Sequence, residues 1–396
     1  MMERVDWKNF KSDEDIVSYL SKLPRYRNTP IKSILSRLRF FLSVLYCRLF
    51  SIDKPLFVVL VTNNTCNLNC IYCYGEYGKR SKKDDYSTGV LLEIIDELKE
   101  LGTTLLTIHG GESLLRKDIG EILNYVKLKG FYVSFNTNGY FVPHRIKDLL
   151  GVDTVVLSLD GREENNDKNR GKGCYQKVMN AIDILHQHNL PVVVSATINK
   201  YTLNDMEYLA ELAVEKKFRI QYSILYNGDK LKTQEYSGVM TDDENRSVAK
   251  KILALKKKGY PVYYSGDILE TAIYWPFSFD EKQVITRADV QAGLKQKKMR
   301  LVPCYHGRLK YQIDADGRVV LCWAQNDADA PNVKKVGVAK AIQTCHDNKK
   351  CEYCVFLANN EHNAVLNLGL KNIWDIAAIQ FADALEIRKK KVKSNQ

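Results

Sequence analysis

The sequence predicts an α/β fold, a partial (β/α)6 TIM-like barrel followed by a smaller cysteine-rich domain. Between residues 57 and 226, six short apolar runs alternate with stretches of helical spacing. Continuous apolar runs are typical of strands buried on both faces of a parallel sheet, and six units supply most of an eight-unit barrel. The expected strands are residues 57–62, 104–109, 132–137, 154–159, 192–198 and 220–225.

Helix stop signals support the alternation. Residues 90–101 are followed by Gly102, and residues 117–129 by Gly130. A further helix is expected over residues 175–188, shortly before Pro191, and another over residues 204–217. Glycine just past a helix and proline beyond it are common terminators, so four helices are predicted between the six strands.

We divide the 396 residues into four parts. Residues 1–55 form an N-terminal amphipathic helical segment, and residues 56–226 the barrel. Residues 227–300 are a helical bridge, with helices expected over 241–259 and 267–275. Residues 301–396 form a C-terminal domain that ends in the basic run from Arg388 to Lys393.

The composition is that of an ordinary globular protein, with 45% hydrophobic and 27% charged residues. A net charge of +12 favours anionic partners, but without a basic, aromatic-rich face we expect no nucleic-acid binding. Ten cysteines, eight of them in two groups with metal-like spacing, indicate a reducing, cytoplasmic setting rather than a disulfide scaffold. We expect no secretory signal, and no continuous apolar run approaches the roughly 18 residues that span a bilayer.

The most informative feature is the run Cys66-Asn-Leu-Asn-Cys70-Ile-Tyr-Cys73. It offers three thiolates from one loop after the first strand, and thiolates are the usual ligands of a [4Fe–4S] cluster. Three ligands leave one iron without a protein partner. A small molecule can bind there, as substrate binds at the open position of a catalytic zinc. Zinc sites usually pair two Cys-x2-Cys units, so the triplet favours a cluster over zinc.

This triplet resembles the signature of the radical SAM superfamily, and the similarity covers about residues 57–225 and again the chain from Cys304 onward. The resemblance implies that S-adenosylmethionine (SAM) chelates the open iron of the Cys66/Cys70/Cys73 cluster. It further implies reductive cleavage of SAM to a 5′-deoxyadenosyl radical, which takes a hydrogen atom from an unactivated C–H bond.

Polar residues after the expected strands match further family positions. Gly110-Gly111-Glu112 follow the second strand, where glycines permit close backbone approach and a carboxylate can accept from an ammonium. The resemblance assigns them to the SAM amino group, although Ser113 replaces the common proline. It also places Arg170 on the SAM carboxylate. The other predicted cofactor contacts, whose alternatives are turn capping, a salt bridge or core packing, are Tyr72, Asn136, Ser158, Asp160, Thr197 and Asn199.

A second cysteine group lies in the C-terminal domain. Alternating apolar residues around Asp314-Ala-Asp-Gly317 predict a hairpin that brings Cys304 and Cys322 together, and Cys351-x2-Cys354 adds two thiols. By spacing alone, a zinc site with four cysteine ligands fits nearly as well as a second cluster. The resemblance to the shorter, twitch form of the SPASM extension implies one auxiliary [4Fe–4S] cluster on these four cysteines, with Cys345 left out.

Residues 31–52 place ten apolar side chains on one face of a helix and basic or small polar ones on the other. Basic residues opposite Leu and Phe are typical of a helix at a membrane interface, yet the same stripe could pack against the barrel. The helix would therefore either lie on the anionic inner surface of the membrane or pack inside the protein.

The predicted function is radical SAM chemistry on a membrane lipid or another long apolar substrate, such as C–C bond formation. The alternative is a peptide-modifying enzyme of the SPASM type, and a zinc protein that binds nucleic acid is the non-radical alternative. The leading hypothesis requires a low-potential electron donor of the ferredoxin or flavodoxin type.

Overall fold

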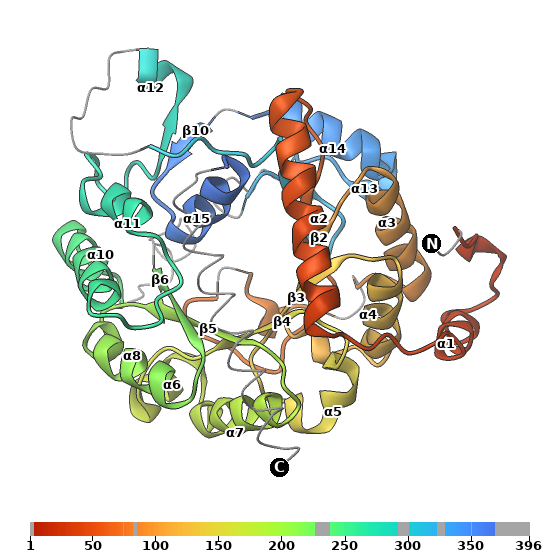
Figure 1. Ribbon diagram of the computed structural model, residues 1–396, viewed down its shortest axis with the longest axis horizontal. Helices are drawn as coiled ribbons and strands as arrows, with labels where there is room; N and C mark the ends of the chain where they lie inside the picture. The colour runs from red at the N-terminus through yellow and green to blue at the C-terminus, as the bar shows by residue number, and fades with distance from the viewer. Residues whose placement is uncertain are drawn as a thin grey trace.

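The computed structural model describes residues 4–73, 75–81, 85–225, 238–291, 301–322, 329–349 and 351–368. The basic run from Arg388 to Lys393 lies outside this part of the chain, as do the ends of the expected helical bridge. Six parallel strands follow one another in space as in sequence (Figure 1). They are β1 (Phe57–Val61), β2 (Leu105–His109), β3 (Tyr132–Thr137), β4 (Thr154–Ser158), β5 (Val192–Ile198) and β6 (Arg219–Ile224).

Helices ring the outside of this sheet (Figure 1). They are α3 (Thr88–Glu100), α4 (Ile119–Leu128), α5 (Val142–Leu149), α6 (Glu163–Arg170), α7 (Cys174–Gln187) and α8 (Met206–Glu215). The predicted terminators hold, since Gly102 and Gly130 adopt φ values of 93° and 81° after α3 and α4. The short helices α5 and α6 were not predicted, because eight residues with little apolar content leave almost no periodic pattern.

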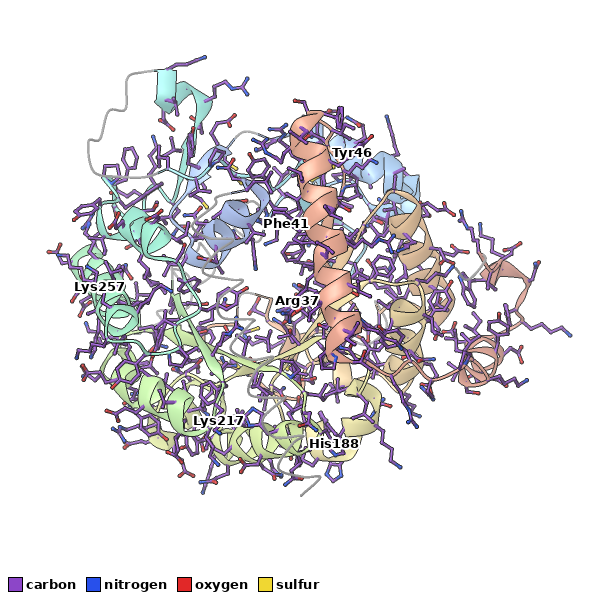
Figure 2. The ribbon with its side chains drawn as sticks, viewed as in Figure 1. Arg37, Phe41, Tyr46, His188, Lys217 and Lys257 are labelled. Atoms are coloured by element: carbon purple, nitrogen blue, oxygen red, sulfur yellow. The ribbon has the colours of Figure 1, made fainter. Side chains whose placement is uncertain are left out.

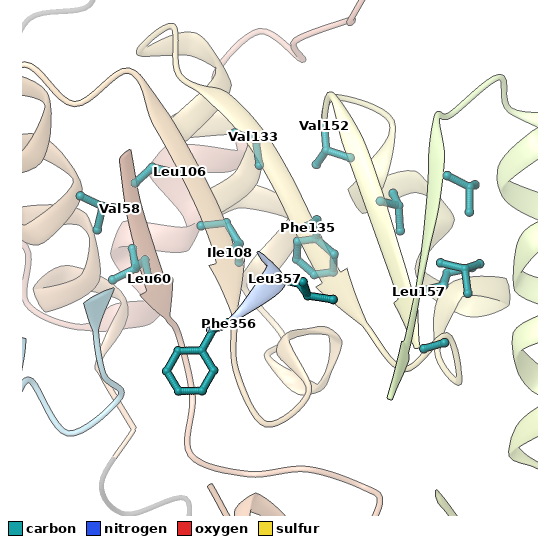
Figure 3. Packing of buried hydrophobic residues seen from close by; sticks show 14 of the residues in the cluster. Val58, Leu60, Leu106, Ile108, Val133, Phe135, Val152, Leu157, Phe356 and Leu357 are labelled. Carbon is teal, nitrogen blue, oxygen red and sulfur yellow. The ribbon is translucent and has the colours of Figure 1, made fainter. Parts of the chain in front are cut away.

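The strands differ from expectation in one respect. In β2, β3 and β4, burial alternates along the strand, so only one face is fully covered. Apolar side chains such as Leu106, Ile108 and Phe135 belong to the main core (Figure 3). Thr107, Ser134, Asn136 and Ser158 lie on the opposite, half-buried face. Because the helices cover the outside of the sheet, these polar side chains line the inside of the barrel.

The sheet is open and is extended by the C-terminal region. Strand β8 (Lys310–Ile313) pairs in parallel with β1, and β9 (Val319–Val320) returns antiparallel to it. The predicted turn is present, and Gly317 adopts φ 97° there. The hairpin is therefore an added edge of the barrel sheet, and it places residues 314 and 315 beside the loop that follows β1.

The remaining C-terminal elements are α13 (Val333–Val336), α14 (Val338–Asp347), β10 (Cys351–Cys354) and α15 (Leu357–Leu366). Phe356 and Leu357 join the barrel core (Figure 3). The bridge contains α10 (Asp242–Lys257), α11 (Gly266–Ile273) and α12 (Arg287–Gln291), and α10 begins with a capping box between Thr241 and Glu244. It is not wholly helical, because β7 (Val284–Thr286), rich in β-branched residues, pairs antiparallel with β10.

Ahead of the barrel lie a 3-10 turn (Trp7–Asn9), α1 (Asp13–Ser21) and α2 (Pro30–Leu49). Helix α2 starts with Thr29 as its cap and Pro30 in its first turn. It crosses the edge where the strands begin, and Arg37 on α2 contacts Tyr132, the first residue of β3. Among the described residues, no helix is both long and apolar enough to cross a membrane.

Candidate iron–sulfur and SAM site

The cysteine triplet lies in the loop that follows β1, at the carboxyl edge of the sheet, where sites of parallel barrels form. Leu68 N and Asn138 Nδ2 lie 3.4 and 3.8 Å from Cys66 Sγ and point hydrogen-bond donors at it. Burial raises the pKa of Cys66 to about 11 and that of Cys70 to about 12. The free thiols are thus neutral, and metal binding would have to displace their protons.

The residues fit an iron–sulfur cluster. The three thiols influence one another electrostatically, which places them in one neighbourhood. Each iron of a cubane takes its own thiolate, so three neighbouring thiols from one loop suit three of its irons. N–H groups directed at a ligand sulfur also suit a cluster, whose potential they tune.

The loop after β2 packs directly on the loop before Cys66. Gly111 N donates to Asn63 O at 3.1 Å, and Glu112 N donates to Thr65 O at 2.9 Å. A Cβ at Gly111 would lie 2.2 Å from Thr65 O and 2.9 Å from Cys66 N. Gly110 is similarly close to Asn63. Gly111 is therefore required by contact between two backbones, and Gly110 by the Asn63 side chain.

Glu112 is 1% exposed and joins β2 to β3. Its carboxylate accepts hydrogen bonds from Leu114 N at 3.0 Å, Thr137 Oγ1 at 2.9 Å and Asn138 N at 2.8 Å. Burial outweighs these donors and raises the pKa of Glu112 to about 7. In this structure the predicted partner of the SAM amino group also holds Asn138, whose side chain reaches Cys66.

On the other side of the loop, Asp160 is fully buried and accepts hydrogen bonds from four residues. Tyr72 Oη lies 2.5 Å away, Arg170 donates through Nε at 3.0 Å and Nη2 at 2.7 Å, and Thr197 N lies at 2.9 Å. Asn169 Nδ2 donates at 3.2 Å. Burial holds the pKa of Tyr72 well above its ordinary value, so its hydroxyl keeps the proton that it donates.

Several of the predicted cofactor contacts already make hydrogen bonds within the protein. Arg170 uses two of its five N–H donors on Asp160, and Asn199 Nδ2 donates to Asn169 Oδ1 at 3.1 Å. Ser158 ends β4 on the polar face, in register with Ser195 of β5. Asn136 Oδ1, on β3, is buried and has no hydrogen-bond partner among the described residues. An unpaired buried acceptor inside the barrel suits a polar ligand such as a ribose.

Two residues of this arrangement were missed by sequence reasoning. Asn138 connects Glu112 to Cys66, and Asn169 connects Asp160 to Asn199 while its carbonyl accepts from Ile71 N at 3.0 Å. Asn138 precedes Gly139, and Asn169 precedes Arg170 at the end of a helix. Neither position carries a sequence signal for a site, and only the fold brings them to the cysteine loop.

The four predicted auxiliary ligands are all buried and lie at 4–7% exposure. Cys304 N donates to Glu352 O at 2.8 Å, which brings Cys304 beside the pair on β10. The Cys351 thiol donates a hydrogen bond to Cys304 and lowers the pKa of Cys304 to about 6, and Cys322 influences Cys354 electrostatically. Cys345, on α14, is buried in the main core and influenced by Cys322. No single-ion group occurs among these described residues either.

The fold and the site define an open (β/α) barrel with a cysteine triplet at its carboxyl edge. Residues 60–213 match the radical SAM superfamily. The chain is 30% identical over 220 residues to Fe-coproporphyrin III synthase of Methanosarcina barkeri, covering 54% of this chain and 55% of that protein. It is 29% identical over 167 residues to the mycofactocin maturase MftC of Mycolicibacterium smegmatis, covering 41% and 42%. The barrel region of the chain is thus similar to the radical SAM superfamily, whose members use a [4Fe–4S] cluster and SAM.

Among solved structures, Streptococcus suis SuiB bound to the precursor peptide SuiA has a TM-score of 0.56 at 15% identity, covering 86% of this chain and 80% of that one. The anSMEcpe protein with bound AdoMet has a TM-score of 0.54 at 18% identity, covering 74% and 82%. At such low identities, the structural likeness shows the fold alone. The chain spans about half the length of the curated relatives it matches.

Proposed function

We propose that this protein is a radical SAM enzyme that modifies a peptide. When bound, the cluster and SAM would supply a 5′-deoxyadenosyl radical that takes a hydrogen atom from an unactivated C–H bond. The observation that carries this proposal is the placement of Cys66, Cys70 and Cys73 at the carboxyl edge of a domain matched by the superfamily.

The chain's own residues would hold and shield this chemistry. The three thiolates would hold the cluster and leave one iron to SAM. Asn138, fixed by Glu112, donates toward Cys66 from one side of the loop. Tyr72 and Arg170, both fixed on Asp160, hold the other side. The polar inner face of β3, β4 and β5 would orient the nucleoside, with Asn136, Ser158 and Thr197 nearest to it.

The peptide is favoured by the relatives. Besides the mycofactocin maturase, these include the sporulation killing factor maturation protein SkfB of Bacillus subtilis, 30% identical over 161 residues, and the PqqA peptide cyclase of Ruegeria pomeroyi, 26% identical over 170 residues. They support the alternative of the sequence analysis over its leading substrate, a membrane lipid or other long apolar molecule.

A second candidate substrate class is an iron porphyrin. The longest match named above is to Fe-coproporphyrin III synthase, and an AdoMet-dependent heme synthase of Methanosarcina barkeri is 32% identical over 155 residues. The two classes predict different products, so they can be separated directly.

The auxiliary cysteines would hold a second [4Fe–4S] cluster that binds substrate or accepts the electron of the substrate radical. The first cluster must be reduced before SAM is cleaved, so the enzyme would need a low-potential donor of the ferredoxin or flavodoxin type. Two cubanes contain about eight irons per chain.

The test is anaerobic reconstitution followed by chemical reduction in the presence of SAM. We expect about eight irons per chain and release of 5′-deoxyadenosine. The triple variant Cys66→Ala, Cys70→Ala, Cys73→Ala should keep about four irons and release none. Peptides and iron coproporphyrin would then be compared for stimulated 5′-deoxyadenosine release and a mass change in the added compound. A wild-type protein that binds zinc, or that holds iron but leaves SAM intact, would refute the proposal.

A further inference from the structure

Helix α2 presents its apolar side outward. Successive turns expose large side chains at spacings of three and four residues, which is one face of a helix. Their exposed fractions are 49–70%, far above those of the core. The exposed residues on this face are Ile31, Ile34, Leu35, Leu38, Leu42, Tyr46 and Leu49.

The opposite side of α2, which faces the barrel, packs through Val44 and Cys47 and also makes polar contacts. Arg37 Nη2 lies 3.3 Å from Tyr132 Oη, and the Arg37 guanidinium lies 5.4 Å from the centre of that ring. Arg48 lies 5.0 Å from the ring centre of Tyr305. Val44 and Cys47 are the two fully buried side chains of the helix. The apolar stripe is therefore not what holds α2 on the barrel, and packing inside the chain does not explain it.

A groove of about 500 Å³ lies between the apolar side of α2 and barrel residues near the start of β2. Leu35, Leu38 and Leu42 line it together with two cationic residues, Arg39 and Lys54. Arg39 is exposed and Lys54 half-buried. A surface that places cations beside a row of leucines suits an anionic headgroup whose hydrocarbon lies next to it.

The same edge of the barrel carries further positive charge. Lys217 lies two residues before β6, and Lys257 ends α10; both are exposed. Figure 2 draws α2 in front of the strands, with Arg37, Phe41 and Tyr46 on it, and Lys217 and Lys257 across the barrel from it. Lysines at helix ends are also favoured by the helix dipole, and these two add positive charge to the edge that α2 crosses.

We propose that α2 docks this protein on an anionic membrane surface, with the strand-start edge of the barrel against the lipid. A second copy of the chain is a poor occupant, because it would bring the same cations, such as Arg39 and Lys54, against each other, and like charges repel. The C-terminal run from Arg388 to Lys393 is also basic and is a poor occupant for the same reason. The cysteine triplet lies at the opposite edge of the sheet, so docking leaves the substrate side open to solvent.

The experiment is sedimentation of the full chain with vesicles of phosphatidylcholine alone, or of phosphatidylcholine and phosphatidylglycerol in equal parts. We expect binding to the anionic vesicles that weakens with salt, because each cation near the surface adds about fivefold in affinity. The variant Leu35→Ser, Leu38→Ser, Leu42→Ser should bind on the order of 100-fold more weakly. A second variant, Arg39→Glu, Lys54→Glu, should lose the preference for anionic vesicles.

The matched control replaces three exposed apolar residues elsewhere, Tyr274→Ser, Val290→Ser and Val336→Ser, and should bind like the wild type. Circular dichroism and 5′-deoxyadenosine release should be unchanged in the leucine variant, which separates this proposal from the enzymatic one. Sedimentation velocity without lipid tests the other occupants. Wild type that ignores anionic vesicles, equal binding by the leucine variant, or a dimer that only the leucine variant abolishes would overturn the proposal.

Discussion

Arg170 and Asp160 form a buried, two-point ion pair, with Nε 3.0 Å from Oδ2 and Nη2 2.7 Å from Oδ1. Their side chains are 9% and 0% exposed. Asp160 at the end of β4 thereby joins α6 to Tyr72 in the cysteine loop and to the backbone of β5. The pair supports the loop that would hold the cluster.

The first prediction concerns this pair. Arg170→Gln leaves Asp160 buried and charged with fewer donors, so the apo chain should lose about 3–5 kcal/mol of unfolding free energy. Urea denaturation measures the loss. Arg162→Gln is the matched control, because Arg162 lies 3.7 Å from Asp205 with a side chain 61% exposed, and it should cost less than about 1 kcal/mol. Similar losses in both variants would contradict the structural role assigned to Arg170.

Asn169→Ala tests the second missed residue. It removes a donor to Asp160 and the acceptor of Asn199, and unmade buried hydrogen bonds cost about 1–3 kcal/mol. We also expect weaker SAM binding, seen as a higher SAM concentration for half-maximal 5′-deoxyadenosine release. Asn165→Ala, which removes one hydrogen bond to Asp205 at a half-buried site, is the control and should leave this concentration unchanged. If Asn169→Ala reached half-maximal 5′-deoxyadenosine release at the wild-type SAM concentration, the hydrogen bonds of Asn169 would be unimportant for SAM binding.

Gly111→Ala should disrupt the first cluster selectively. The new Cβ would lie 2.2 Å from Thr65 O, so the backbone ahead of Cys66 must move. Reconstituted protein should then hold about four irons in place of about eight and release no 5′-deoxyadenosine. Gly266→Ala has its nearest neighbour at 3.7 Å and should retain both properties. Full iron content in Gly111→Ala would mean that the loop tolerates the displacement.

Glu112 should make the apo chain less stable as the pH rises. Burial raises its pKa from 4.5 to about 7, so the folded state favours the protonated acid. The resulting stabilisation is fully present below about pH 4.5 and is lost as the pH rises through about 7, amounting to about 3 kcal/mol. Glu112→Gln should flatten this decline in urea denaturation between about pH 5 and about pH 8. The exposed control Glu207→Gln should leave the slope unchanged, and an unchanged slope in Glu112→Gln would place the titration elsewhere.

The auxiliary ligand set can be tested by iron content alone. Cys354→Ser should reduce the iron of the reconstituted protein from about eight to about four per chain, because one thiolate of the second cluster is missing. Cys345→Ser should keep about eight, since Cys345 is not among the four predicted ligands. If the two variants exchange these results, Cys345 is a ligand in place of Cys354.

Much of the barrel could be predicted because it depends on local patterns. Apolar runs separated by glycine-terminated helices located all six strands, and the Asp314–Gly317 turn located the hairpin. Helices α5 and α6 lack such a pattern and were missed. The polar inner face of the strands was also missed, because an alternation broken by threonines and serines resembles a buried run.

The substrate class was not decided by the chain's own patterns. The exposed stripe of residues 31–52 suggested a lipid, whereas the relatives favour a peptide. The stripe tells only that α2 is amphipathic. Which side of α2 faces the barrel depends on Arg37 meeting Tyr132 from β3, a contact between residues 95 positions apart.

The sequence by itself determined the cofactor chemistry, since three thiols within eight residues are close in any fold of the chain. Only the tertiary structure decided how that loop is held. Glu112, Asn138 and Asp160 reach the loop because parallel strands bring their carboxyl ends to one edge, and Asn169 reaches it from α6. Likewise, only packing could show that α2 keeps its apolar side outward, because periodicity defines a face but not its direction.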